Sequence, residues 1–290
     1  MIGGSRLRLT GEQLEADFAP EAGMVCCSLR YRGEELLGQR DGLEAYAKTG
    51  KTMGIPLLHP WANRLGEWRY EALGRSVDLE PLKGRLVRAD GATGLPNHGT
   101  LPREWRVVGD GTAELDGASE AFPFPHTVRL EASVEGGALR IATTVEAHDG
   151  PVPVTFGFHP YLVAPRVPRA DWHVELPVKR RLVLTEQKIP SGETTPAEPY
   201  DGALRDLAFD DGYDELTGAP FVLAGGGRRI EVTFGENFPV AQVYAPPEKE
   251  LICFEPMTAR ADALRSGGFP VATPGSPYRA EFSIAVSDSG

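Results

Sequence analysis

The chain has 290 residues, of which 41% are hydrophobic and 24% are charged, and its formal net charge is −11 at pH 7. This composition is typical of a soluble globular protein, and a chain of this length can bury a large core without disulfides or metal ions. The acidic balance argues against nucleic acid and anionic membranes as partners. It argues more weakly against a strongly anionic substrate, because a local basic pocket could override the global charge.

Alternation of apolar and polar residues is the dominant pattern along the chain. It begins at residues 5–11 ("SRLRLTG") and returns at residues 24–37, where a glycine turn separates two half-buried runs. The clearest case lies within residues 126–147, where alternation from Val128 to Val134 and from Leu139 to Val145 flanks "EGG" and predicts a β-hairpin. Further strands are expected at residues 172–177, 181–186, 220–235, 239–246, 251–256 and 279–287.

Long helical periodicity is nearly absent. Only "LRDLAF" (residues 204–209) and "ARADAL" (residues 259–264) could form single helical turns. The 34 glycines and 25 prolines are spread along the chain, which indicates many turns between short strands. The pattern predicts an all-β fold, a large antiparallel β-sandwich or barrel-like structure, and a single domain over residues 1–290 is the simpler interpretation.

Three cysteines cannot form a full set of disulfides. Cys26 and Cys27 are adjacent, so on a strand they point to opposite faces, and Cys253 lies in an apolar run. We expect all three to be reduced and the protein to be cytoplasmic. The first residues lack the apolar core of a signal peptide, and no apolar segment reaches the roughly 18 residues that would span a bilayer.

Two loops place polar residues beside glycine or proline. Trp61, Asn63 and Arg64 follow His59-Pro60. In one interpretation the arginine stacks on tryptophan at the surface. In the other, these residues form a donor cluster for an oxygen-rich ligand, with Trp61 as an apolar platform. His98 precedes Gly99, which allows a backbone or ligand to approach closely, so His98 is either a turn histidine or a ligand-binding one.

Polar residues also interrupt or end three expected strands. His159 follows "FGF" and precedes Pro160, where it has either a structural or a chemical role. Glu255 ends the apolar run that precedes Pro256, and a carboxylate there is costly unless it is paired or hydrogen-bonded, so it is the strongest functional candidate. Gln242 interrupts an apolar strand and is either satisfied in the core or directed at a ligand.

An acidic cluster at Asp210, Asp211 and Asp214 is a solvated turn or, less readily, a calcium loop, because the EF-hand spacing is not met. The sequence contains no G-x-S-x-G, P-loop, H-E-x-x-H or C-x-x-C motif. Two histidines with Glu255 could hold a metal ion, but their spacing is unlike that of many zinc sites, so we expect no metal.

Five motifs occur together in one order: "ANRLG", "NHGT", "FGFHPYL", "AQVYAP" and "ICFEPMTARADAL". Together they resemble the aldose 1-epimerase (galactose mutarotase) family, from about residue 20 to the C-terminus. The resemblance implies that family's fold, the galactose mutarotase-like supersandwich, which is a large antiparallel β-sandwich with very little helix.

The resemblance also implies roles for single residues. Glu255 matches the family's catalytic carboxylate and His159 its catalytic histidine, and His98 matches a sugar-binding histidine that we group with them in the catalytic set. The sugar-binding positions that the resemblance implies are Asn63, Arg64, Gln242 and either Asp210, the first choice, or Asp211.

Departures from the family pattern point to a divergent branch. The chain has "FDDGY" where the family has aspartate followed by histidine, "NHGT" in place of His-Gly-Gly, and His148 where many members carry asparagine. A preference for galactose itself is therefore not implied.

The implied activity is that of an aldose 1-epimerase, which interconverts the α and β anomers of a free aldose without a cofactor. Glu255 would act as the general base and His159 as the general acid, each favouring the charged form of the other across a cleft about as wide as a sugar ring. The partner would be a monosaccharide, and the protein a monomer or homodimer.

Three alternatives remain open. A hexose-6-phosphate mutarotase would need additional arginines at the pocket, for which Arg64, Arg69, Arg103 and Arg106 are candidates. A non-catalytic carbohydrate-binding protein of the same fold would need no acid opposite a base. A metal-dependent, cupin-like enzyme would lose activity in chelator.

Overall fold

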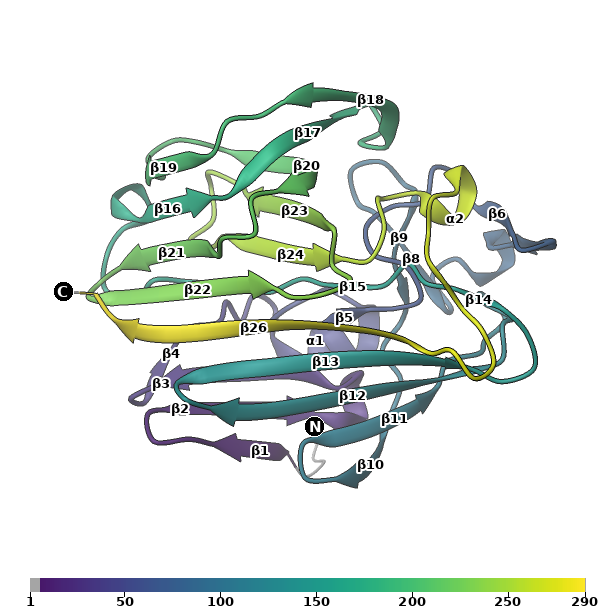
Figure 1. Cartoon of the computed structure of the whole chain (residues 1–290), viewed down its shortest axis with the longest axis horizontal. Coiled ribbons are helices and arrows are strands. Elements are labelled where there is room, and N and C mark those ends of the chain that lie inside the picture. Colours follow the sequence, from purple (N-terminus) through teal and green to yellow (C-terminus); the bar gives the residue numbers. More distant parts are fainter. Residues whose placement is uncertain (1–5, 290) are drawn as a thin grey trace.

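The computed structural model describes residues 6–289, and its largest sheet contains the predicted hairpin (Figure 1). Residues His126 and Ala147 pair at one end of the hairpin and Glu135 and Ala138 at the other, so the prediction is confirmed. The sheet has nine strands in the order β10 (Arg106–Gly109), β11 (Thr112–Asp116), β12 (His126–Glu135), β13 (Ala138–Ala147), β26 (Tyr278–Asp288), β22 (Arg228–Phe234), β21 (Phe221–Gly225), β16 (His173–Leu176) and β19 (Tyr200–Ala203).

A second sheet of seven strands carries four of the eight candidate site residues, namely Asp210, Asp211, Gln242 and Glu255. Its order is β18 (Pro190–Pro196), β17 (Val178–Leu184), β20 (Phe209–Leu216), β23 (Val240–Ala245), β24 (Cys253–Met257), β15 (Gly157–Phe158) and β5 (Leu57–Leu58). All pairings between these strands are antiparallel.

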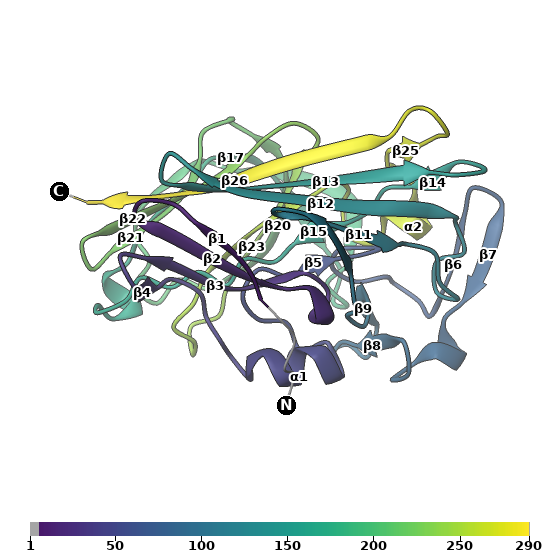
Figure 2. The ribbon, with the colours of Figure 1, turned by 90° about the horizontal axis from the view of Figure 1, so that it is seen from below.

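A four-stranded sheet packs against the long hairpin. It consists of β1 (Leu7–Thr10), β2 (Leu14–Ala19), β3 (Val25–Tyr31) and β4 (Glu34–Glu35). Figure 2 shows β12, β13 and β26 as one layer, with β1, β2 and β3 beneath it. Three two-stranded sheets complete the fold: β6 (Arg69–Ala72) with β7 (Arg75–Asp78), β8 (Val87–Ala89) with β9 (Pro96–Thr100), and β14 (Val152–Pro153) with β25 (Val271–Ala272).

The core forms because alternate residues of each long strand face inward. On β12 and β13, Val128, Leu130 and Ile141 are buried, whereas their neighbours Arg129 and Arg140 are exposed. Burying each such apolar side chain contributes about 1.5–3 kcal/mol. The main cluster of buried residues draws on the chain from Leu14 to Val286.

Strands make up 52% of the structure and helices 7%, which confirms the all-β prediction with very little helix. The predicted turn at residues 259–264 corresponds to the start of a short helix, α2 (Ala263–Ser266). The prediction of a helical turn at residues 204–209 is wrong: Leu204 to Leu207 form an isolated hydrogen-bonded turn that leads into β20.

The structure adds one helix that the sequence pattern did not predict, α1 (Gly42–Thr49). Gly50 ends it in a left-handed conformation, with its N–H donating to the carbonyl of Tyr46. The packed face of this helix consists of Leu43, Tyr46 and Ala47, which are at helical spacing, but eight residues are too few for this pattern to be distinctive in the sequence. Three 3₁₀ turns lie at Pro20–Ala22, Glu80–Leu82 and Arg169–Asp171. None of the helices between residues 6 and 289 is long and apolar enough to cross a membrane.

The three cysteines are free thiols, as predicted. Cys26 is buried and its neighbour Cys27 is half-buried on β3, which agrees with the opposite orientations expected on a strand. Cys253 is fully buried on β24.

The half-buried His59 and the fully buried His126 lie side by side. His59 and His126 approach to 3.1 Å between their Nε2 atoms, and the Nδ1 of His126 lies 2.6 Å from the carbonyl oxygen of Phe124. The Nδ1–H of His126 donates to that carbonyl, so its Nε2 accepts a hydrogen bond from His59. This geometry requires His126 to be neutral, because a proton on its Nε2 would face the N–H of His59.

Acidification should therefore destabilise the fold. Burial lowers the pKa of His126 to about 4 and holds the pKa of His59 well below its usual value near 6.5. Below pH 6.5 these histidines bind protons in the unfolded chain but stay neutral in the folded protein. The free energy of unfolding therefore falls by about 1.4 kcal/mol per pH unit for each histidine. Urea denaturation at pH 7.5, 6.5 and 5 measures this loss.

Two variants separate this pair from other titrating groups. His126→Gln should lose about 2 kcal/mol less than the unmodified chain between pH 6.5 and 5. His148→Gln, which replaces an exposed histidine, should lose as much as the unmodified chain. Equal losses in both variants would rule out the buried pair as the cause.

Candidate functional site

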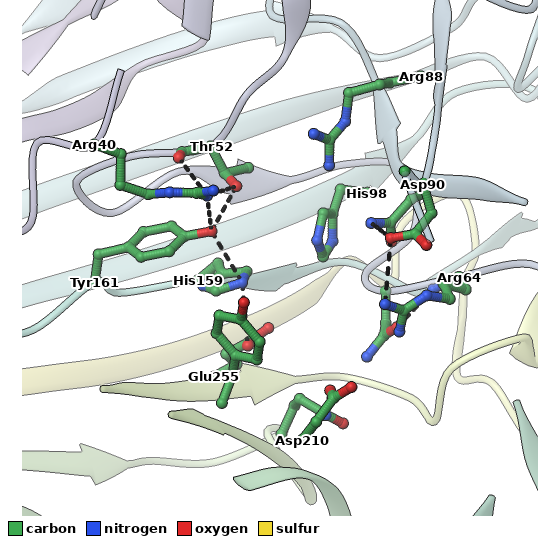
Figure 3. Close-up of a pocket in the computed structure, with 15 residues that line it drawn as sticks. Arg40, Thr52, Arg64, Arg88, Asp90, His98, His159, Tyr161, Asp210 and Glu255 are labelled. Carbon is green, nitrogen blue, oxygen red and sulfur yellow. Dashed lines mark hydrogen bonds and ion pairs between the residues drawn. The ribbon is translucent and has the colours of Figure 1, made fainter. Parts of the chain in front are cut away.

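A polar cavity of about 180 Å³ opens beside the seven-stranded sheet (Figure 3). Loops that precede α1 and follow β5, β8 and β15 form its walls together with the sheet. Its lining contains seven of the eight residues that the sequence singles out. The lining residues are Arg40, Thr52, Asn63, Arg64, Arg88, Asp90, Gly91, Asn97, His98, His159, Tyr161, Asp210, Gln242, Tyr244 and Glu255.

Strand register explains why acid and amide side chains gather on one face of the sheet. Gln242 on β23 lies opposite Glu255 on β24, and it lies opposite Gly212 on β20. Since alternate residues of a strand share a face, Asp210 is on the same face as Gly212. The amide Nε2 of Gln242 donates to the Asp210 carboxylate at 3.0 Å.

Asp211 lies outside the cavity. It is the next residue on β20, so its side chain points to the other face of the sheet, where its carboxylate pairs with Arg181 at 2.5 Å. Of the two acids left open by the sequence, Asp210 is the one that lines the cavity.

His159 and Glu255 lie in direct contact. His159 follows β15, which pairs with β24, and its Nε2 is 3.3 Å from Oε1 of Glu255. This separation is shorter than the sugar-ring width expected from the sequence, because β15 and β24 are hydrogen-bonded neighbours in the sheet. Both side chains are nearly fully buried.

Tyr161 positions the His159 ring. The two rings stack with centroids 4.2 Å apart and planes 9° apart. The phenol oxygen of Tyr161 is 3.2 Å from Nε2 of His159, 2.6 Å from Oγ1 of Thr52 and 2.8 Å from Nη1 of Arg40. The imidazole therefore has one orientation before any ligand binds.

Burial opposes charge on both members of the pair. It raises the pKa of Glu255 well above its usual value, with a further contribution from the charge of Asp210. It lowers the pKa of His159 well below its usual value, and the charge of Arg40 acts in the same direction. Burial in the pocket thus favours a protonated Glu255 beside a neutral His159, whereas the sequence predicted that each would favour the charged form of the other.

Two buried atoms of this pair remain available to a ligand. Among residues 6–289, neither Nδ1 of His159 nor Oε2 of Glu255 has a hydrogen-bond partner. Buried polar atoms are rarely left unpaired, so these atoms indicate a place where an additional polar group is bound.

His98 on β9 and Asn63 in the loop after β5 both have a left-handed backbone conformation, with φ of 60° and 58°. The N–H of His98 donates to the carbonyl of Asn63 at 2.9 Å, and the His98 ring lies 5.4 Å from that of His159. Burial lowers the pKa of His98 well below its usual value, as does the charge of His159. Backbone strain of this kind clusters at functional sites.

Arg64 lies in the pocket wall, and its Nη2 is 3.3 Å from a carboxylate oxygen of Asp90. Trp61, by contrast, is fully buried in the core and does not line the cavity, so it cannot serve as the apolar platform considered from the sequence.

Sequence analysis did not identify several lining residues, namely Arg40, Thr52, Arg88, Asp90, Asn97, Tyr161 and Tyr244. Three of them stand within quoted motifs: Asn97 in "NHGT", Tyr161 in "FGFHPYL" and Tyr244 in "AQVYAP". Arg40 and Arg88 have no signal that separates them from the other arginines of the chain. Within residues 6–289, no three His, Cys, Asp or Glu side chains are grouped so as to hold a metal ion.

Comparisons with known proteins agree with this architecture. A family model described as aldose 1-epimerase matches residues 9–285. No curated protein matches the chain.

Solved structures share the fold over nearly the whole chain. A putative aldose 1-epimerase from Escherichia coli K12 is 17% identical, with a TM-score of 0.77 over 98% of this chain and 99% of that one. A galactose mutarotase-like protein from Clostridium acetobutylicum is 14% identical, with a TM-score of 0.80 over 97% and 95%. A galactose 1-epimerase from Lactobacillus acidophilus is 13% identical, with a TM-score of 0.72 over 98% and 94%.

Proposed function

The chain belongs to the aldose 1-epimerase family, and on this premise we propose that it is a mutarotase that interconverts the α and β anomers of an aldose. The observation that supports this most strongly is the contact between Nε2 of His159 and Oε1 of Glu255 at the base of a polar cavity. The two oxygens that exchange protons during anomerisation are bonded to the same carbon, C1. An acid and a base that serve them must therefore converge on one point.

In the proposed mechanism, Glu255 accepts the proton of the C1 hydroxyl while the imidazolium of His159 donates a proton to the ring oxygen. The bond between C1 and the ring oxygen breaks, and C1 becomes the carbonyl carbon of the open-chain aldehyde. Rotation about the C1–C2 bond then turns the other carbonyl face toward the C5 hydroxyl. Ring closure reverses both proton transfers, so no net proton is consumed.

The pKa directions at this pair favour proton transfer. Because burial raises the pKa of Glu255, its carboxylate is a stronger base than an exposed one. Because burial lowers the pKa of His159, its imidazolium is a stronger acid. The protonated Glu255 and neutral His159 that burial favours are also the states that follow ring opening. Ionising Glu255 and His159 therefore costs free energy before the reaction starts. This free energy is recovered when proton transfer leaves both groups neutral as the ring opens.

The remaining polar groups would hold the sugar. Asp210, Gln242 and Asn63 face the cavity and offer carboxylate and amide groups to hydroxyls. His98 would hydrogen-bond the sugar close to His159. Anchoring the part of the sugar remote from C1 leaves C1 free to rotate between the two ring closures.

Three of the four arginines that were candidates for binding a sugar phosphate lie outside the cavity. Arg69 is exposed on β6, Arg103 donates to backbone carbonyls at residues 117 and 118, and Arg106 pairs with Glu114. Of that set, only Arg64 lines the cavity.

NMR exchange spectroscopy of α-D-glucose and α-D-galactose, with and without the protein, tests the proposed activity. We expect faster exchange between the anomeric signals with at least one aldose, unchanged by a chelator. A sugar that binds without faster exchange would identify a carbohydrate-binding protein instead. Loss of exchange in chelator would indicate a metal-dependent enzyme.

A further inference from the structure

Asp262 is a buried acid outside the cavity that the proposed mechanism does not use. It stands in the motif "ICFEPMTARADAL", downstream of Glu255. Asp262 is 6% exposed, and its backbone has a left-handed conformation with φ of 64°. A buried carboxyl group and a left-handed residue other than glycine each cost free energy, and strain of this kind clusters at functional sites.

Asp262 binds the loop that carries Asn63 and Arg64. Its carboxylate Oδ1 accepts a hydrogen bond from the N–H of Gly66 at 2.7 Å. Its backbone N–H donates to the carbonyl of Arg64 at 2.9 Å. The loop is therefore held at Arg64 itself and again at Gly66.

Arg265 closes the outer side of this contact. Its Nη1 lies 3.0 Å from Oδ2 of Asp262, and its Nη2 pairs with Glu67 at 2.5 Å. Arg265 belongs to α2, which packs against β6 (Figure 1). Burial raises the pKa of Asp262 despite the hydrogen bond from Gly66 and the charge of Arg265, so these contacts only partly offset the cost of burying the carboxyl group.

Hydrogen bonds continue from Asp262 to the cavity. Arg64, which accepts from Asp262, donates its own N–H to the side-chain oxygen of Asn63 at 2.8 Å. The carbonyl of Asn63 in turn accepts from the N–H of His98 at 2.9 Å. Asn63, His98 and Asp262 all have a left-handed backbone. Hydrogen bonds thus connect these three strained residues, of which Asp262 alone lies outside the cavity.

The segment that carries Asp262 is anchored to the seven-stranded sheet. The N–H and the hydroxyl of Thr258 both donate to the carbonyl of Phe156, which directly precedes β15, at 3.0 and 2.9 Å. Arg260 pairs with Asp214 on β20. These anchors fix Asp262 relative to the sheet that carries the proposed catalytic base.

We propose that Asp262 is a positioning residue that holds Asn63 and Arg64 in the conformation that binds the sugar. It acts through the loop and does not touch the substrate. The inference rests on the proposed role of the cavity as a sugar site. Without the carboxylate the loop would have to be ordered when the sugar binds, at a cost in affinity. Glu255 and His159 lie on other segments and would keep their contact.

Asp262→Gly removes the carboxylate and leaves a residue that adopts the left-handed conformation without strain. The probe is D-glucose or D-galactose, whichever binds the unmodified chain more tightly. We expect Kd from calorimetry and KM from NMR exchange to rise at least tenfold, while kcat changes less than threefold. Asp262→Asn keeps an oxygen that can accept from Gly66 and tolerates the left-handed conformation, so its Kd should stay within threefold of the unmodified chain.

Asp17→Ala is the control for a purely structural role. Asp17 is also 6% exposed, pairs with Arg8 and Arg30 in the four-stranded sheet and lies outside the cavity. This variant should lose stability but keep its Kd. If Asp262 acts through Asn63, the double variant Asp262→Gly with Asn63→Ala should lose less affinity than the two single losses combined.

The outcomes separate the positioning role from the activity. An unchanged Kd in Asp262→Gly, or an equal rise in Asp17→Ala, overturns the positioning role, and anomer exchange by the unmodified chain would still support the mutarotase proposal. If the unmodified chain binds sugar without faster exchange and Asp262→Gly binds it at least tenfold more weakly, the positioning role stands and the activity fails.

Gly66→Ala decides the question if Asp262→Gly does not fold. Its added Cβ would lie 3.2 Å from Oδ2 of Asp262 and 2.5 Å from Nη1 of Arg265, so it disturbs the same contact from the side of the loop. Both atoms end side chains that can move, so this variant should fold. We expect a Kd at least threefold higher, and an unchanged Kd would overturn the positioning role.

Discussion

Glu255→Gln is expected to lower kcat for anomer exchange by about 10²–10⁴-fold while the sugar still binds. The amide has the shape of the carboxyl group but cannot accept the C1 hydroxyl proton as a base. His159→Asn should cause a loss of the same size, because it removes the acid. Exchange rates from NMR and binding constants from calorimetry separate catalysis from affinity.

Non-additivity provides a second check on this prediction. Since Glu255 and His159 contact each other and act on one carbon, the double variant should be little slower than either single variant. Asp211→Asn serves as a matched control on the opposite face of the sheet and should retain activity. Full activity in both single variants would show that the acid and base are assigned wrongly.

Fold stability should not limit the interpretation of Glu255→Gln. Because burial already favours the protonated carboxyl group, the neutral amide avoids the cost of a buried charge. We therefore expect urea denaturation at pH 7.5 to show no loss of stability in this variant.

Gly99→Ala is expected to be strongly destabilising. Gly99 has φ of +72°, and an added Cβ would lie 2.1 Å from the carbonyl oxygen and 2.4 Å from the carbonyl carbon of His59. Both are backbone atoms, so no side-chain rotation relieves the clash. The residue before it is His98, which would be displaced from the cavity.

Gly94→Ala isolates the clash from the backbone conformation. Gly94 also has φ of +72°, but an added Cβ would meet nothing within 4 Å. This control should cost about 1–2 kcal/mol for the left-handed conformation alone, and Gly99→Ala about 1–3 kcal/mol more for overpacking. Urea denaturation followed by circular dichroism measures both, and equal losses would contradict the argument.

Strand periodicity predicted much of the fold because it is a local property. The hairpin of β12 and β13 could be read from alternation alone, since every second residue faces the core. Helix α1 could not, because its apolar face of Leu43, Tyr46 and Ala47 spans only two turns, which is too short for a helical period to stand out.

Some residues of the candidate site could be predicted from the sequence and others could not, because only some of them carry a local signal. Glu255 and His159 stood out as polar residues at the ends of apolar runs, and the family resemblance marked them as well. Arg40, in the loop before α1, and Arg88, on β8, reach the cavity only because separate segments meet there, which is a property of tertiary structure. The distance within the catalytic pair and the directions of its pKa shifts likewise depend on strand pairing and burial, which one sequence does not display.

The position of β26 has a consequence for synthesis on the ribosome. This strand, residues Tyr278–Asp288, lies between β13 and β22 in the middle of the nine-stranded sheet. Until it emerges, β13 and β22 each present an open edge of backbone donors and acceptors. A nascent or prematurely terminated chain would therefore offer two sites at which a foreign strand can pair, and protection by a chaperone matters most just before translation of this segment is complete.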